Sequence, residues 1–107
     1  MQQLSAPALA GQLNDPSRAA PVLLDVREAW EVQTCALPDS VHIPLREIPA
    51  RFEELDPQAE IVCICHHGGR SAQAAMFLAS RGFSKVFNLQ GGVDAWARQV
   101  DPSMPTY

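Results

Sequence analysis

The sequence predicts an α/β fold in which helices cover both faces of a parallel sheet. Two observations support this prediction. Short apolar runs that favour strands alternate with segments of helical periodicity, and this alternation is typical of parallel sheets. In addition, the run "EIVCIC" at 60–65 is apolar at nearly every position, as expected of a strand that is buried on both faces.

The first 35 residues are expected to form a helix, a strand and a short helical turn or loop. Ser5 can cap the helix and Pro7 fits its first turn, while the turn formers at 14–16 should end it. The apolar run at 22–26 predicts a buried strand. The stretch at 27–35 is polar with one large aromatic residue, so we expect a helical turn or loop there.

The middle of the chain predicts a short strand, a helix and the clearest strand of the sequence. The β-branched stretch at 40–45 predicts the short strand. Between 46 and 55 the apolar spacing of i, i+4 and i+7 predicts a helix, whose buried face would consist of Ile48, Phe52 and Leu55. Pro57 should end this helix before the strand at 60–65 begins.

The last third of the chain predicts two helices with a strand between them. The segment 71–80 is the clearest helix, and Gly82 stands where a glycine cap belongs. The apolar face of this helix is expected to consist of Ala72, Ala75, Met76 and Ala79. The run at 85–89 predicts the last strand. A final helix follows, with an apolar face made of Val93, Trp96, Ala97 and Val100.

Cys65 stands where an α/β protein places its chemistry. It ends the strand at 60–65, and in parallel sheets ligands bind outside the carboxyl ends of the strands. The loop that follows contains Gly68 and Gly69, whose conformational freedom lets backbone N–H groups turn inward. The free N–H groups at the start of the next helix add to this anion-binding nest, and Arg70 adds a fixed charge. We therefore expect the Cys65 thiol to be ionised near neutral pH.

The other cysteines and the neighbouring histidines are given different roles. Cys63 lies in mid-strand among apolar residues and is expected to be a small buried hydrophobe. Cys35 lies in a polar segment; it could resolve an oxidised Cys65, but we treat it as incidental. No metal site is expected, because there is no Cys-x-x-Cys pair and no second pair of ligands follows. His66 and His67 are either loop-mouth residues that contact an anion or simply exposed.

The composition fits one globular domain and argues against several classes of protein. The 107 residues suffice for one hydrophobic core, and 47% of them are hydrophobic. A net charge of −4 without a basic run argues against binding to nucleic acid or to an anionic membrane surface. The sequence predicts no signal peptide and no membrane span, and its three cysteines fit a reducing, cytoplasmic setting. We expect flexible segments at 14–21 and 101–107.

Four stretches resemble the rhodanese homology domain, in that family's order and at its spacing. They are "DVRE" at 25–28, "HIPL" at 42–45, "CHHGGRS" at 65–71 and "GFSKVFNLQGGVDAW" at 82–96. Together they span nearly the whole chain, so residues 1–107 are similar to a single-domain rhodanese of bacterial type. The resemblance implies a central sheet of about five mostly parallel strands. The segment around Cys35 departs from the family, which more often has a Gly-His-Ile-type segment there.

By this resemblance the expected reaction is sulfur transfer. The Cys65 thiolate would take a sulfane sulfur from a small sulfur-containing anion such as thiosulfate, and the resulting persulfide would pass it to cyanide, a thiol or a protein. Asp25 and Arg27 would support the active loop, where Arg27 could also contact an anion. Neither a cofactor nor a metal is implied. The loop that holds the persulfide would consist of His66, His67, Gly68, Gly69, Arg70 and Ser71.

Two other functions stay open. The related dual-specificity phosphatases use a longer Cys-x-x-x-x-x-Arg loop, whereas Cys65 and Arg70 enclose one residue fewer. The smaller loop should suit a single sulfur better than a tetrahedral phosphoryl group, and pocket size also counts against an arsenate reductase. Alternatively, the fold could serve as a persulfide carrier or docking module for one protein partner.

Overall fold

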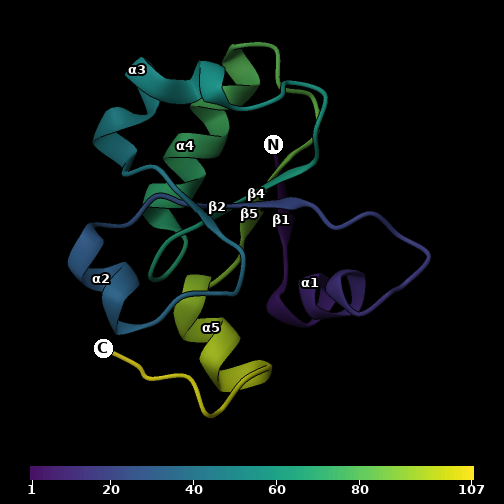
Figure 1. The fold of residues 1–107 in the computed structure, drawn as a ribbon, viewed down its shortest axis with the longest axis vertical. Coiled ribbons are helices and arrows are strands. Elements are labelled where there is room, and N and C mark those ends of the chain that lie inside the picture. The colour runs from purple at the N-terminus through teal and green to yellow at the C-terminus, as the bar shows by residue number, and fades with distance from the viewer.

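The chain forms an open sheet of five parallel strands (Figure 1). A computed structural model describes residues 1–107. The strand order is β1-β5-β4-β2-β3, and every neighbouring pair is parallel. The strands are β1 (Gln2–Leu4), β2 (Val22–Asp25), β3 (Val41–His42), β4 (Ile61–Ile64) and β5 (Val86–Leu89). The prediction of an α/β fold with a central, mostly parallel sheet is confirmed.

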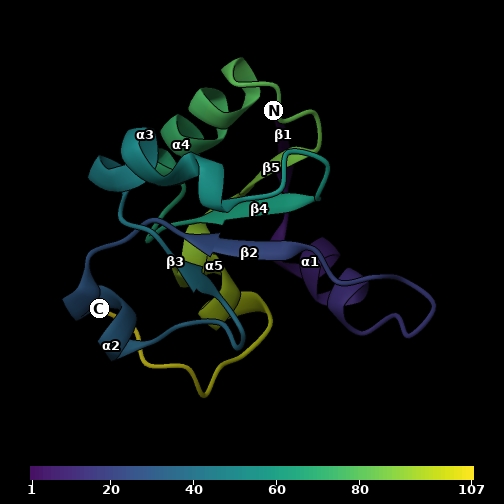
Figure 2. The ribbon, with the colours of Figure 1, turned by 45° about the horizontal axis from the view of Figure 1, so that its top comes forward.

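Helices cover both faces of this sheet (Figure 2). They are α1 (Ala6–Leu13), α2 (Ala29–Thr34), α3 (Ile48–Arg51), α4 (Gly69–Ser80) and α5 (Gly92–Gln99). Helices α3 and α4 lie on one face, and α1 and α5 lie on the other. Helix α2 lies beyond the carboxyl end of β2, near the C-terminal end of the chain.

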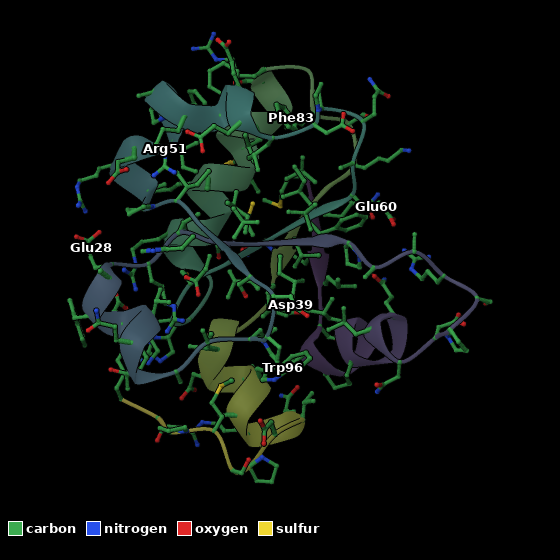
Figure 3. The ribbon with its side chains drawn as sticks, viewed as in Figure 1. Glu28, Asp39, Arg51, Glu60, Phe83 and Trp96 are labelled. Carbon is green, nitrogen blue, oxygen red and sulfur yellow. The ribbon has the colours of Figure 1, made fainter.

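Two hydrophobic cores result from the alternation of side chains along the central strands. Ile61 of β4 belongs to the core under α3 and α4, whereas Val62 belongs to the core between the sheet and the α1–α5 layer. Figure 3 shows Phe83 and Trp96, which belong to these two cores, on opposite sides of the sheet. Because β4 is buried on both faces, its sequence has to be apolar throughout.

The two edge strands are the part of the sheet that the sequence reveals least. Strand β1 pairs with β5, but Gln2 and Gln3 are exposed and give it no apolar run. At the other edge, β3 contains only two residues of the strand predicted over 40–45. Edge strands are covered less than central ones, so weaker sequence patterns suffice to form them.

The helix predicted over 46–55 is instead a succession of three short turns. A 3-10 turn at Leu45–Glu47 leads into α3, and a second one at Phe52–Glu54 follows it. Pro49 has no N–H group for the carbonyl four residues earlier, which disfavours an α-helix that begins at 46, and it lies instead in the first turn of α3. The predicted apolar face nevertheless packs into the core, with Ile48, Phe52 and Leu55.

Helix α4 is confirmed, but its buried face was predicted wrongly. The prediction included Ala72, Met76 and Ala79 with Ala75, whereas the buried residues are Ser71, Ala74, Ala75 and Leu78. Met76 is 55% exposed. On the observed face the Ser71 hydroxyl points inward to the Cys65 sulfur, and Ala74 and Leu78 pack in the core. Gly82 follows the helix with a left-handed φ of 92°, as its predicted capping role requires.

None of the helices combines the length and the apolar character that crossing a membrane requires. The segment 101–107, predicted to be flexible, packs Met104 and Tyr107 against the core next to α5. Its mobility stays a prediction. The Tyr107 ring also reaches His66, in the loop after β4.

Candidate active site

Cys65 lies at the carboxyl end of β4, at the base of a loop that closes around its sulfur. Gly68 adopts a left-handed φ of 108°, and its N–H group donates to the Cys65 Sγ at 3.0 Å. Helix α4 begins at the next residue, and the N–H group of Ser71 in its first turn helps to lower the pKa of the Cys65 thiol. Because Cys65 is only 1% exposed, the sulfur sits in an almost closed cradle.

This cradle favours the charged form of the thiol. Burial alone would raise the pKa of Cys65, but the Ser71 hydroxyl and the N–H groups of Ser71, Gly68 and His67 outweigh it and lower the pKa below its ordinary value. The direction agrees with the expectation drawn from the loop sequence. By contrast, burial raises the pKa of Cys63 to about 12, so that thiol stays protonated.

Asn88 of β5 orients the Ser71 hydroxyl, a role that was not apparent from the sequence. Its Nδ2 group donates to Gln3 Oε1 at 3.0 Å and to the Gly68 carbonyl at 3.1 Å, which leaves its Oδ1 for Ser71. The Ser71 Oγ lies 2.5 Å from this Oδ1 and 3.2 Å from the Cys65 Sγ. The Ser71 hydroxyl has one hydrogen to donate, so it can bind Asn88 Oδ1 while the thiol is protonated and turn to the Cys65 sulfur when the thiol ionises. The only indication of this role in the sequence was that Asn88 is a single amide within an otherwise apolar strand.

Arg70, at the end of the loop, forms an ion pair with Glu31 of α2. Its two Nη atoms lie 2.6 and 2.8 Å from the carboxylate oxygens, and the Glu31 side chain is 4% exposed. The hydrogen bonds from Arg70 prevail over burial and lower the pKa of Glu31 to about 2. Glu31 is 39 residues away from Arg70 along the chain, so no local pattern indicates this pairing.

Asp25 and Arg27 form a buried ion pair at the carboxyl end of β2, next to β4. The Arg27 Nη2 lies 2.7 Å from Asp25 Oδ2, and both residues are fully buried. The remaining N–H groups of Arg27 donate to the carbonyls of Glu31 and Cys35 and to the Tyr107 hydroxyl. Arg27 therefore ties α2 to the sheet, and none of its N–H groups is left to contact an anion.

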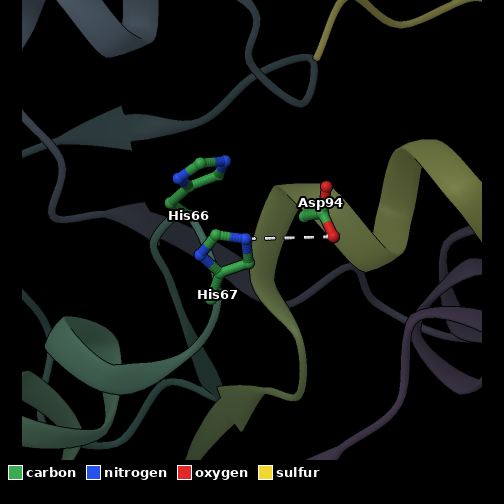
Figure 4. A group of neighbouring side chains, drawn as sticks. All are labelled: His66, His67 and Asp94. Carbon is green, nitrogen blue, oxygen red and sulfur yellow. Dashed lines mark ion pairs between the residues drawn. The ribbon is translucent and has the colours of Figure 1, made fainter. Parts of the chain in front are cut away.

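Figure 4 shows His66 and His67 in the loop after β4 and Asp94 opposite them on α5. Their ligating atoms lie within 4.8 Å of one another, and His67 Nε2 is 3.9 Å from Asp94 Oδ2. Burial lowers the pKa of His66, which favours its neutral form. However, Arg98 Nε already binds Asp94 at 3.0 Å, and this cation opposes a second one at the carboxylate. We therefore assign no metal site to these residues.

The sequence and the fold of this chain match those of known proteins. A model of the rhodanese-like domain matches residues 5–99. The chain belongs to the rhodanese-like family. Among its relatives, a sulfurtransferase of Allochromatium vinosum is 33% identical and the match covers 95% of this chain and 94% of that protein. A thiosulfate sulfurtransferase of Pseudomonas savastanoi pv. phaseolicola is 39% identical over 70% of this chain and 71% of its own length.

Solved structures of this rhodanese-like fold cover the chain almost completely. A human single-domain sulfurtransferase superposes with a TM-score of 0.78 at 26% identity, covering 92% of this chain and 97% of that one.

A longer relative, the chloroplastic rhodanese-like/PpiC domain-containing protein 12 of Arabidopsis thaliana, is 42% identical over 79% of this chain, but the match spans 30% of its length. The predicted family is confirmed, and the named relatives support sulfur transfer.

In this rhodanese-like site, Ser71→Ala should raise the pKa of the Cys65 thiol, because the thiolate loses a hydroxyl donor. We expect iodoacetamide to alkylate Cys65 several-fold more slowly near neutral pH, with the rate profile displaced to higher pH. Peptide mass spectrometry locates the adduct. Ser80→Ala removes an exposed hydroxyl at the other end of α4 and should leave the profile in place. An unchanged profile in Ser71→Ala would mean that the N–H groups alone set the pKa.

The Glu31–Arg70 pair should make the stability of the rhodanese-like fold sensitive to acid. The pKa of Glu31 falls from an ordinary 4.5 to about 2, so its contribution is complete above pH 4.5 and is lost as the pH falls toward 2. Glu31→Gln should lower the free energy of unfolding at neutral pH and should flatten its decline in that acid range. Urea titrations at several pH values measure this. Glu53→Gln, at an exposed position, is the control. The prediction is contradicted if the free energy of unfolding of Glu31→Gln declines in acid as steeply as that of the wild type.

Proposed function

We propose that this chain is a sulfurtransferase that carries sulfane sulfur as a persulfide on Cys65. The observation that supports this most directly is the donor set around the sulfur, with the Gly68 N–H group at 3.0 Å and the Ser71 hydroxyl at 3.2 Å. These donors lower the pKa of the thiol, and a thiolate is both nucleophile and leaving group in sulfur exchange. Residues 1–107 would act as one catalytic domain.

In the loading step, the Cys65 thiolate would attack the outer sulfur of thiosulfate. A bond forms between the Cys65 sulfur and this outer sulfur while the S–S bond of thiosulfate breaks, and the bonding pair leaves with sulfite. The negative charge brought by the thiolate leaves with sulfite, and the outer sulfur keeps its own negative charge in the persulfide, so no proton transfer is needed. The N–H groups of Gly68 and of the start of α4 would stabilise that charge.

In the discharge step, cyanide or a thiolate would attack the outer sulfur of the persulfide. The products are thiocyanate or a new persulfide, and Cys65 returns as a thiolate. Each step moves one neutral sulfur atom between two nucleophiles, so the balance includes no oxidant, reductant or cofactor. Two successive displacements at one residue predict ping-pong kinetics.

The remaining residues of the site would hold the loop in shape. Gly68 supplies the left-handed turn, and Arg70 fastens the loop to α2 through Glu31. The supporting group would include Gly69, Ser71, Asp25 and Arg27, while His66 and His67 would form the mouth through which donor and acceptor pass.

A phosphatase or an arsenate reductase is the weaker candidate. Cys65 and Arg70 enclose four residues, and Glu31 binds both Nη atoms of Arg70, at 2.6 and 2.8 Å. A tetrahedral oxyanion needs a larger loop and a free guanidinium. A persulfide carrier for one protein partner would use the same thiol and would differ only in its acceptor.

Intact-protein mass spectrometry after incubation with thiosulfate tests the proposal. The expected result is a gain of one sulfur atom, about 32 Da, which cyanide then removes. A gain that only a protein partner removes would identify a dedicated carrier. If the folded, reduced protein gains no sulfur, sulfur loading from thiosulfate is contradicted and hydrolysis of a phosphate ester is the next assay.

A further inference from the structure

The segment 105–107 runs back to the mouth of the active loop and places an aromatic ring on it. The Tyr107 ring stacks on the His66 ring, with centroids 3.9 Å apart and planes inclined by 11°. Trp30, on α2, packs against the same tyrosine in a T-shaped arrangement, with ring centroids 5.6 Å apart. A narrow crevice separates this segment from the start of α5; it is lined by Cys35, His66, Val93, Asp94, Pro105, Thr106 and Tyr107. Tyr107 thus covers the residue that directly follows Cys65.

The Tyr107 hydroxyl holds the ring in this position. It accepts a hydrogen bond from Arg27 Nη1 at 2.9 Å and donates one to Glu31 Oε2 at 2.8 Å. These partners belong to two different ion pairs, Asp25–Arg27 and Glu31–Arg70, so the phenol joins both. Burial raises the pKa of Tyr107 to about 12, and the hydroxyl therefore stays a donor at neutral pH. The ring is anchored more firmly than stacking on an exposed loop alone would allow.

We propose that the Tyr107 ring selects among sulfur acceptors by narrowing the mouth of the 65–70 loop on the side of His66. This inference rests on the proposed function, in which Cys65 carries the transferred sulfur. Because Cys65 is 1% exposed, every acceptor has to enter through the mouth of the loop. A diatomic acceptor such as cyanide passes the ring freely. A tripeptide thiol such as glutathione has to fit against it, and steric exclusion of this kind discriminates by size.

Steady-state kinetics with both acceptors test this inference on Tyr107→Ala and Tyr107→Phe. The measured quantity is the ratio of kcat/KM for glutathione to kcat/KM for cyanide. Tyr107→Ala should raise this ratio about tenfold, because only the bulky acceptor gains from the removal of the ring. Tyr107→Phe keeps a ring that can stack on His66 but loses the two hydroxyl bonds that hold it there, so its ratio should rise by less than that of Tyr107→Ala. Met76→Ala, at an exposed position of α4, is the control for an unrelated truncation.

Two outcomes would overturn the inference. One is an unchanged ratio in a Tyr107→Ala protein that is folded by circular dichroism. The other is an equal shift in Tyr107→Phe, which would assign the effect to the hydroxyl and its ion pairs. If Tyr107→Ala does not fold, Tyr107→Leu takes its place; it should raise the ratio by a smaller factor, and an unchanged ratio there has the same meaning.

A separate measurement distinguishes failure of this inference from failure of the proposed function. The rate of Cys65 alkylation depends on access and ionisation but not on sulfur transfer. Removing Tyr107 should raise the rate for N-ethylmaleimide relative to the smaller iodoacetamide. If the wild type gains no sulfur from thiosulfate, the proposed function fails while this alkylation ratio still decides whether Tyr107 narrows the mouth. An unchanged alkylation ratio on an active enzyme contradicts the inference alone.

Discussion

Cys65→Ser should abolish both the loading and the transfer of sulfur. Serine has nearly the same shape at the end of β4, but its hydroxyl does not ionise near neutral pH and is a poor nucleophile toward sulfur. We expect the rate of thiocyanate formation from thiosulfate and cyanide to fall at least about a thousandfold, as for the loss of other covalent nucleophiles. The mass gain after incubation with thiosulfate should disappear as well.

Cys63→Ala is the matched control for this substitution. Cys63 lies two residues earlier in β4, is fully buried in the core that also contains Cys65, and has a pKa raised to about 12. Its thiol is therefore neither accessible nor ionised, and the variant should still load and transfer sulfur. Loading that persists in Cys65→Ser, or is lost in Cys63→Ala while the fold is intact, would contradict the assignment of the nucleophile.

The sequence predicts the features of this site that neighbouring residues determine. The apolar run of β4, the glycines after Cys65 and the helical pattern beyond them lie within one short stretch, so their order alone places a thiol at a helix start. The left-handed φ of 108° at Gly68 agrees with the reason for expecting a glycine there. Local patterns also identified most of the buried face of α5, since Val93, Trp96 and Ala97 are buried, whereas Val100 follows the helix and is partly buried.

The features that the sequence does not reveal depend on partners far apart in the chain. In the sequence Glu31 is one of several charged residues in a polar stretch, and only the fold places it beside Arg70. Asn88 became part of the site because β5 lies beside β4, and Tyr107 because the chain returns to α2. The buried face of α4 was predicted wrongly for a similar reason. Apolar residues lie on more than one side of this helix, and the buried side is the one that also carries the contact between Ser71 and Cys65.

Gly92→Ala should have the largest effect on stability. At this position α5 supports the active loop, since Val93 N–H donates to the Cys65 carbonyl at 2.9 Å and Asp94 N–H to the His66 carbonyl at 3.1 Å. A Cβ atom on Gly92 would lie 2.3 Å from the Cys65 oxygen and 2.4 Å from the His66 oxygen, far inside van der Waals contact. Both obstacles are backbone atoms, so no side chain can move aside.

The φ of +60° at Gly92 adds to this clash, because it is unfavourable for any residue with a Cβ atom. Together the clash and the strain should lower the free energy of unfolding by at least about 3 kcal/mol, measured by urea titration with tryptophan fluorescence. The protein that still folds should transfer sulfur more slowly, since the loop cannot close around Cys65 as before. Gly11→Ala is the control: apart from the neighbouring backbone of α1, no atom lies within 4 Å of its Cβ, and it should stabilise α1 by up to about 1 kcal/mol. Equal stability of the two variants would mean that α5 does not support the loop in this way.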